Sequence, residues 1–275
     1  MNSETNTLPP RPKQSKTSLL KKYGLGLGFL ALIIWSIMGT NEKVDWTRVF
    51  SMRTIENMDR VIPKLFQPTL DKLDRVLELM LETLLIAFTG SFMASILAIP
   101  LGFLTAKNMM GNSLAGRIAN FICKLFLNAV RTFPEILLAL IFVASIGPSP
   151  FAGVLAIAIG STGMLGKLYG EVIETIDMQV VEAMEANGAN KIQTLFYGII
   201  PQILPDFLSY AIYRFEIDVR ASTILGIIGA GGIGTLIVIS QKNRNWDEVS
   251  LILIVIIISV TIIDLISAQI RKRLV

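Results

Sequence analysis

The side chains best suited to chemistry in this sequence are charged groups that interrupt long apolar runs. Arg131 and Glu135 lie four residues apart around a Thr-Phe-Pro sequence, and Arg214 lies four residues before Asp218. Cationic side chains in apolar surroundings can bind an anion, but an arginine and a carboxylate at this spacing can also pair with each other on a helix. Internal pairing is the favoured interpretation for most of these charges.

Some of these charges remain candidates for contact with an anion. Arg131 and Arg220 are the strongest of them, whereas Lys167 can instead extend its amine to lipid headgroups and shares a helix face with Glu171. Pro134 is expected to kink the helix that carries Arg131 and to free backbone carbonyl groups there. The candidate side chains are Arg131, Glu135, Lys167, Arg214 and Arg220.

Residue usage excludes most catalytic chemistry. The chain has no histidine, which excludes Ser-His-Asp triads, HExxH zinc sites and histidine proton shuttles. Its one cysteine, Cys123, lies in an apolar run and can form neither a disulfide framework nor a cysteine metal site. The sequence therefore predicts no enzyme active site and no metal site.

The composition indicates that lipid surrounds the elements that carry these charges. Of 275 residues, 52% are hydrophobic and only 17% are charged, whereas soluble domains usually contain about 25% charged residues. A helix needs about 20 apolar residues to cross the hydrocarbon layer, so we expect an all-α membrane protein with about six transmembrane helices. The expected spans are residues 23–38, 79–106, 118–146, 151–169, 196–217 and 249–268.

The distribution of basic residues predicts the orientation. The net charge is +4, but the basic residues lie at the ends of apolar runs, which indicates lipid rather than nucleic acid as a partner. The tail 1–22 is polar, basic and expected to be disordered, and residues 23–275 form the transmembrane domain. Both termini are expected in the cytoplasm. Segment 41–78 would then lie outside, where apolar residues at helical spacing predict an amphipathic helix.

A cytoplasmic loop is expected at residues 171–197, between the fourth and fifth spans. Asp177 is a suitable N-cap for a helix with apolar residues on one face. Gly188 can end that helix, and Asn190 can cap a second helix that leads into the fifth span.

This loop resembles the cytoplasmic coupling loop of ABC importer permeases, whose pattern is E-A-A, three residues, G, nine residues and I-x-L-P. Met184, Gly198 and Ile200 depart from the pattern, and the residues that match it in register are Glu182, Ala183, Gly188 and Pro201. A short helix ended by a glycine can dock into a groove of a partner protein; an ordinary polar loop is the alternative. The expected coupling residues are Glu182, Ala183, Glu185, Gly188, Pro201 and Pro205.

Further segments resemble the phosphonate ABC transporter permease family. They are Arg131-Thr-Phe-Pro-Glu135, Gly147-Pro-Ser-Pro-Phe-Ala-Gly153, Gly163-Met-Leu-Gly-Lys167 and Tyr213-Arg-Phe-Glu-Ile-Asp-Val-Arg220 with the glycine-rich run after it. The resemblance implies a type I (MetI-like) permease fold in the inner membrane and a homodimer. It also implies two ATPase subunits on the cytoplasmic face and a periplasmic or extracytoplasmic binding protein that delivers phosphonate, phosphite or a related phosphorus oxyanion.

The chain lacks its own nucleotide site. The P-loop pattern is absent, and near Gly166-Lys167 a serine stands where its first glycine should be. No cofactor is therefore expected on this chain, and ATP and magnesium are expected on the partner ATPase. The run from Gly229 to Gly234 matches G-x-G-x-x-G formally, but no βαβ unit surrounds it. It predicts close helix packing or an unwound turn instead.

Three other functions are alternatives to a phosphonate importer permease. An ABC importer permease for another small solute would share every feature of the loop. An ion-coupled secondary transporter would need its own coupling groups and often shows repeated halves, and the sequence has no clear repeat. A membrane enzyme would need a cluster of acid, base or nucleophile, which the spacing of the carboxylates and lysines does not suggest.

Overall fold

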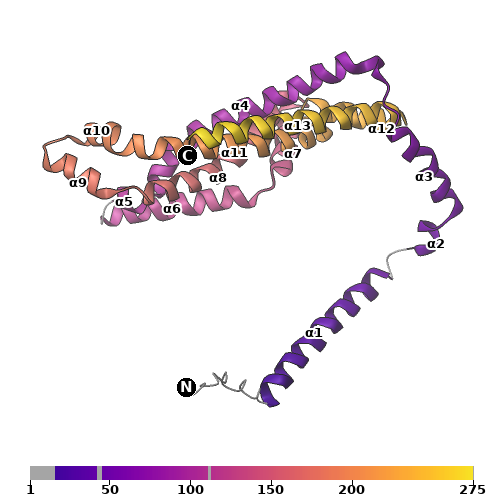
Figure 1. Cartoon of the computed structure of the whole chain (residues 1–275), viewed down its shortest axis with the longest axis horizontal. Helices are drawn as coiled ribbons and strands as arrows, with labels where there is room; N and C mark the ends of the chain where they lie inside the picture. The colour runs from indigo at the N-terminus through magenta and orange to yellow at the C-terminus, as the bar shows by residue number, and fades with distance from the viewer. Residues whose placement is uncertain (1–15, 42–44, 111–112, 275) are drawn as a thin grey trace, which may run out of the picture. The chain divides into compact units, whose positions relative to one another are not determined.

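The computed structural model describes residues 16–41, 45–110 and 113–274, and these residues form helices without a single strand, as expected (Figure 1). The long helices are α1 (Lys16–Asn41), α3 (Met52–Leu65), α4 (Leu73–Thr105), α6 (Leu114–Thr132), α7 (Glu135–Ile146), α8 (Pro150–Glu174), α11 (Ile200–Leu225) and α13 (Trp246–Leu274). The shorter ones are α2 (Trp46–Val49), α5 (Lys107–Met110), α9 (Met178–Ala186), α10 (Lys191–Gln193) and α12 (Ile233–Lys242).

The chain divides into two compact units, Met1–Val61 and Ile62–Val275. In the first unit, α1 starts at Lys16, so the predicted disordered tail 1–22 is wrong for residues 16–22, while residues 1–15 lie outside the described residues. Residues 16–22 contain neither proline nor glycine, and each residue added to an existing helix gains one backbone hydrogen bond. The part Tyr23–Asn41 is long and apolar enough to cross a membrane.

The predicted amphipathic segment 41–78 contains a strongly amphipathic helix, α3. Its apolar residues Ile55, Met58 and Ile62 recur at helical spacing and are exposed, while charged residues occupy the positions between them. The helix does not fill the predicted segment, because a short 3₁₀ turn (Leu70–Lys72) leads into α4, which starts at Leu73, before residue 78. Its outer location stays a prediction.

Six spans are confirmed if one bent pair of helices counts as a single span. Among the described residues, five helices are long and apolar enough to cross a membrane. The sixth is the pair α6 and α7, whose axes differ by 84°. The helices extend past the predicted bounds; α8, for example, runs to Glu174 rather than ending near Tyr169, because charged residues sustain a helix after the apolar run has ended.

Pro134 causes a full break between α6 and α7 rather than the expected kink. It has no N–H to donate to a helix, and it forces the preceding residue, Phe133, into an extended conformation with φ −76° and ψ 122°. Pro134 then serves as the N-cap of α7. The predicted single span 118–146 is therefore two helices with an elbow between them.

The centre of the second unit is the contact between α4 and α8, which run side by side (Figure 1). Small residues let the two backbones approach closely. A Cβ atom on Gly102 would lie 2.7 Å from the Cβ of Tyr169, and a Cβ on Gly90 would lie 2.7 Å from the side chain of Ile157. α11 packs against both helices and α13 packs against α11.

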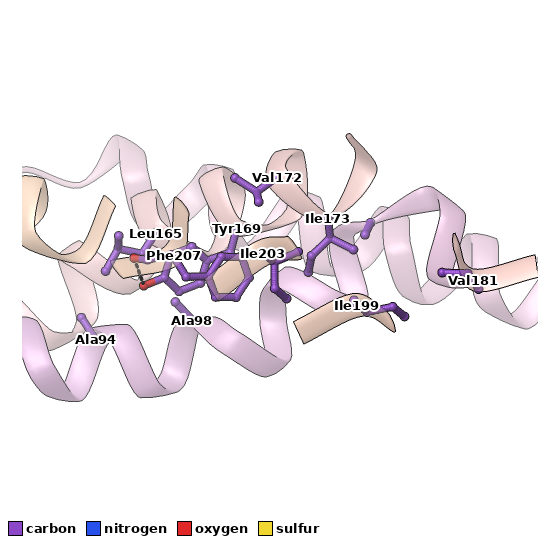
Figure 2. Packing of buried hydrophobic residues seen from close by; sticks show 11 residues of the cluster. Ala94, Ala98, Leu165, Tyr169, Val172, Ile173, Val181, Ile199, Ile203 and Phe207 are labelled. Atoms are coloured by element: carbon purple, nitrogen blue, oxygen red, sulfur yellow. Dashed lines mark hydrogen bonds between the residues drawn. The ribbon is translucent and has the colours of Figure 1, made fainter. Parts of the chain in front are cut away.

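Figure 2 shows the hydrophobic cluster at one end of this bundle, where α4, α8 and α11 meet the segment around α9. The rings of Tyr169 and Phe207 stack with centroids 3.8 Å apart, and the Tyr169 hydroxyl donates a hydrogen bond to the Phe207 carbonyl at 3.3 Å. Val181 of α9 and Ile199 belong to the same cluster. The loop between the fourth and fifth spans is therefore continuous with the core.

The glycine-rich run forms an unwound turn, as predicted, at the opposite end of the bundle. Gly229, Gly231 and Gly232 have φ of +91°, +83° and +74°, which side chains rarely adopt. Residues of α4 hold the turn: the Gly232 amide donates to Glu82 at 3.1 Å and the Ile233 amide donates to Thr83 at 2.8 Å. The short helix α12 that follows was not predicted, because its apolar stretch is too short to signal a span.

The close approach of α4 and α8 predicts that Gly102→Ala destabilises the protein. The added methyl group meets the Tyr169 Cβ, which cannot rotate away, so overpacking should reduce stability by about 1–3 kcal/mol. Thermal unfolding of the purified protein in detergent measures the change. Gly28→Ala is the matched control, because a Cβ added to Gly28 would meet no atom of a packing neighbour within 4 Å. Equal unfolding temperatures for the two variants would contradict the packing.

Candidate functional site

The first candidate site is the loop between α8 and α11, which folds as predicted into a helix, a glycine turn and a second helix. The Asp177 carboxylate accepts a hydrogen bond from the Gln179 amide at 2.9 Å and caps α9. At the other end, Gly188 has φ of +86°. The Gly188 amide donates to the Glu185 carbonyl at 2.9 Å and the Ala189 amide to the Met184 carbonyl at 3.0 Å. This is the Schellman ending, which satisfies the last carbonyls of a helix.

The second half of the loop is capped equally tightly. The side chains of Asn190 and Gln193 each accept a hydrogen bond from the other residue's amide at 2.9 Å. A π-helical turn (Thr194–Ile199) then joins α10 to α11, and Pro201 lies in the first turn of α11, where a missing N–H is tolerated. Because α8 extends to Glu174, the loop is shorter at its start than the predicted 171–197.

The loop exposes one face and anchors the other. Glu182, Ala183, Glu185 and Gly188 are exposed, and Pro201 is exposed while Pro205 is half-buried. On the anchored side, Val181 is buried. A concave surface of about 660 Å³ opens between the two helices, lined by Val180, Ala183, Met184, Asn187, Gly188, Ala189 and Gln193.

A hydrogen bond joins the loop to the fifth span. The Asp177 amide donates to the Gln202 side chain at 2.9 Å, and Gln202 lies at the start of α11. Figure 1 shows α9 and α10 projecting from the end of the bundle at which α13 ends. The loop thus has an open outer face and is bonded to α11 on its other side, and we call the segment of α9 and α10 the lever.

The second candidate site is a cluster of buried charges between four helices. Arg214 and Asp218 of α11 lie one helical turn apart, with the Arg214 Nε 2.9 Å from an Asp218 oxygen. Glu135 at the start of α7 pairs with the same arginine. Ser91 of α4 and Ser161 of α8 donate hydrogen bonds to Asp218 at 2.6 and 2.8 Å. Asp218 is fully buried and Arg214 nearly so.

This cluster is an internal network rather than an open anion site. One guanidinium faces two carboxylates, and its remaining contacts go to the Ser161 oxygen at 2.9 Å and the Met164 sulfur at 3.3 Å. The arrangement supports internal pairing for Arg214, the favoured sequence interpretation. The network links α7 to α11 across the bundle and restrains their relative positions. We call it the buried lock; it consists of Ser91, Glu135, Ser161, Arg214 and Asp218.

The expected pair of Arg131 with Glu135 within one helix is wrong. The chain breaks between α6 and α7, so the two residues are not on one helical face, and Glu135 turns to Arg214 instead. Arg131 is exposed at the last turn of α6, and no ion-pair partner for it exists in the part of the chain that the structure describes. It is the candidate anion contact that remains available.

The other candidates are paired near the surface. Lys167 and Glu171 form the predicted i, i+4 pair at 3.5 Å, with both side chains about half exposed. Arg220 binds both carboxylate oxygens of Asp264 on α13, at 3.0 and 3.1 Å. Arg271 of α13 is partly exposed, and its guanidinium lies 3.0 Å from the buried carboxylate of Glu216 on α11.

Sequence reasoning missed the partners that come from distant helices. Ser91 and Ser161 are ordinary small polar residues of membrane helices, and Asp264 lies inside a long apolar run. Asp264 is the one member of this group that sequence reasoning could have flagged, because a carboxylate within a span is costly unless it has a partner.

Comparisons with known proteins agree with this arrangement. Residues 98–275 match the family model described as "Binding-protein-dependent transport system inner membrane component". A phosphite transport system permease protein of Stutzerimonas stutzeri is 38% identical over 194 residues, which are 70% of this chain and 69% of the relative. A putative cryptic phosphonate transport system permease protein of Escherichia coli (strain K12) is 38% identical over 121 residues, which are 44% of this chain and 99% of the relative.

The fold also matches a solved structure. The MetNI methionine ABC transporter in an inward-facing conformation superposes with a TM-score of 0.63 at 20% identity, covering 73% of this chain and 96% of the other. This confirms the predicted fold of an ABC importer permease. The chain belongs to the binding-protein-dependent transport system inner membrane components, the permease subunits of ABC importers, a family membership that implies an ATPase and a substrate-binding protein as partners.

Proposed function

We propose that this permease forms the path by which a phosphonate, phosphite or a related phosphorus oxyanion enters the cell, driven by separate ATPase subunits. The observation that carries the proposal is the capped helix–glycine–helix lever of α9 and α10, in a chain that has no P-loop of its own. The substrate class rests on the relatives named for phosphite and phosphonate transport at 38% identity.

The proposed assembly contains two copies of this chain, two ATPase subunits and an extracytoplasmic binding protein for the anion. ATP and magnesium belong to the ATPase subunits, and this chain holds no cofactor. A substrate path between two copies would explain why a half-exposed ion pair, Arg220 with Asp264, lies within two apolar spans. Such charges are costly in lipid and usually face water or protein.

The proposed orientation places the lever, the N-terminus and the C-terminus in the cytoplasm of a cell with this chain in its inner membrane. The lever lies at the end of the bundle where α13 finishes with Arg271, Lys272 and Arg273 (Figure 1). Lys107 and Lys191 are near the same end, in the short connections to α6 and α11. Basic residues that flank spans are typical of the cytoplasmic side, which supports the proposed orientation.

The proposed mechanism is alternating access driven through the lever. ATP binding closes the ATPase subunits and moves the exposed face of α9, which carries Glu182 and Glu185. Because the Asp177 amide is bonded to Gln202 and Val181 is packed in the core, α9 passes this motion to α11. The buried lock of Arg214 then carries the motion to α7.

Reconstituted transport tests the proposal as a whole. The complex of permease, ATPase and binding protein in liposomes should take up phosphonate or phosphite only when ATP is present on the lever side. Uptake driven by an ion gradient without any ATPase would support a secondary transporter instead. Purification of the permease from its native membrane should retain the ATPase, and a chain that never retains it would overturn the coupling role.

Gly188 provides a specific test of the lever. Gly188→Val forces a β-branched residue into a left-handed conformation, whereas Gly188→Asn is tolerated there. We expect the valine variant to transport at least about fivefold more slowly, as a strain of 1–2 kcal/mol would produce. The asparagine variant should keep most activity. Uptake rate is measured alongside the amount of inserted protein, and equal rates for the two variants would rule out the turn as a coupling element.

Arg214→Met should destabilise the bundle. It leaves the fully buried Asp218 without a cation, which typically costs about 3–5 kcal/mol. Lys167→Met is the control, since it removes one partner of an exposed pair worth less than about 1 kcal/mol. In detergent, Arg214→Met should unfold at a clearly lower temperature than Lys167→Met. Adding Asp218→Asn to Arg214→Met should restore part of the loss, and no restoration would show that the carboxylate is not the cause.

Arg131→Gln should slow uptake of the anion without lowering stability. Arg131 is exposed at the elbow between α6 and α7 and is free of an ion pair within the described ranges, so its charge can meet a passing oxyanion. The loss of one charged hydrogen bond predicts about tenfold slower transport. Arg117→Gln, at an exposed position near the start of the same helix, is the control. If both variants transport equally well, Arg131 does not line the path.

A further inference from the structure

Two cavities lie end to end along the groove between α6 and α8, and neither belongs to the lever or to the buried lock. The first has a volume of about 320 Å³ and is walled by α4, α6 and α8; its lining residues include Leu97, Phe126 and Ile159. The second has a volume of about 240 Å³ and is lined by charged and polar side chains, among them Lys124 and Lys167. Leu127 lines both, and its buried side chain packs on Gly166 between them, so the two cavities are neighbours along the groove and are divided by this side chain.

The first cavity has almost no polar surface. Thr162, its one hydroxyl residue, donates its hydrogen bond to the Ala158 carbonyl of its own helix at 2.6 Å. Gly163 of α8 and Val130 of α6 line the cavity where the two helices approach closely: a Cβ on Gly163 would lie 2.9 Å from the Val130 side chain. Leu97 and Phe126 on the rim are about half exposed. In a membrane such a groove is open to lipid and accepts a hydrocarbon chain.

The second cavity combines cations with carboxylates. Lys124 lies 3.4 Å from Glu174, and Lys167 lies 3.5 Å from Glu171. Both pairs are long and their side chains are between 32% and 57% exposed, so each holds its partner weakly. The lysine ammonium groups can therefore bind a phosphate group, while the Glu171 carboxylate can accept a hydrogen bond from an ammonium group.

From this juxtaposition we infer that the groove between α6 and α8 binds one phospholipid with a small zwitterionic headgroup, of the phosphatidylethanolamine type. One acyl chain lies along the apolar cavity, the phosphate meets Lys124 and Lys167, and the primary ammonium group meets Glu171. The order of the groups along the groove matches the order within the lipid. The inference depends on the membrane location of the chain and not on its transported substrate.

Native mass spectrometry of the full-length protein in detergent tests this binding. The protein is incubated with equal amounts of phosphatidylethanolamine and phosphatidylcholine that carry identical acyl chains. We expect retention of phosphatidylethanolamine over phosphatidylcholine by about threefold, because the primary ammonium group can donate a hydrogen bond to Glu171 and the trimethylated ammonium group of phosphatidylcholine cannot. Glu171→Gln should abolish this preference. Equal retention of both lipids by the unaltered protein would overturn the proposed headgroup contact.

Two further variants examine the two ends of the site separately. Lys124→Gln with Lys167→Gln should reduce retention about tenfold through loss of charged hydrogen bonds to phosphate. Ile159→Trp should also reduce it, by filling the apolar cavity. The control is Lys64→Gln with Lys242→Gln, two exposed lysines outside both cavities. Retention by the lysine and tryptophan variants equal to that of the control would contradict the proposal.

The soluble headgroup distinguishes a lipid from a free solute. O-phosphoethanolamine has the same phosphate and ammonium groups but no acyl chains, so a large excess of it should not displace the lipid. Displacement, or equally tight binding of this compound alone, would identify the cavity as a solute site and overturn the lipid assignment. Transport activity is not a readout in any arm, so failure of the proposed function leaves this test unaffected.

Discussion

The arrangement of this permease depends on how an apolar bundle accommodates charge at its centre. Asp218 is fully buried, and an isolated carboxylate in such a place would cost several kcal/mol. The protein surrounds it with the Arg214 guanidinium and the hydroxyl groups of Ser91 and Ser161. Because these groups come from α4, α8 and α11, the helices have little freedom to slide past one another. Glu135 extends the same constraint to α7.

The transport model follows from this constraint together with the glycines of α4 and α8. Gly90 and Gly102 allow close packing that leaves no room for even a methyl group. A core of this kind transmits displacement instead of absorbing it. The lever at α9 is joined to the core through Val181 and through the hydrogen bond between Asp177 and Gln202, which is the route by which the proposed motion of the lever would reach the centre of the bundle.

The elbow between α6 and α7 directs side chains that are neighbours in the sequence into different surroundings. Pro134 ends one helix and starts another, and this break turns Glu135 inward while it leaves Arg131 exposed. The outer face of α6 is left with a groove against α8 that combines an apolar stretch with paired lysines and carboxylates. The buried core, the proposed anion contact and the proposed lipid groove thus lie within a few helical turns of one another.

Local physics determined what the sequence could reveal by itself. Apolar runs fixed the helices that cross the membrane, Asp177 and Asn190 marked helix starts, and Gly188 marked a helix end, because each of these signals acts within a few residues of the chain. The family resemblance carried by the lever was likewise local. What only the tertiary structure decided were the contacts between distant residues. Glu135 could pair with Arg131 or with Arg214, and the choice depended on a full break at Pro134 and on the contact of α7 with α11, which no spacing in the sequence encodes.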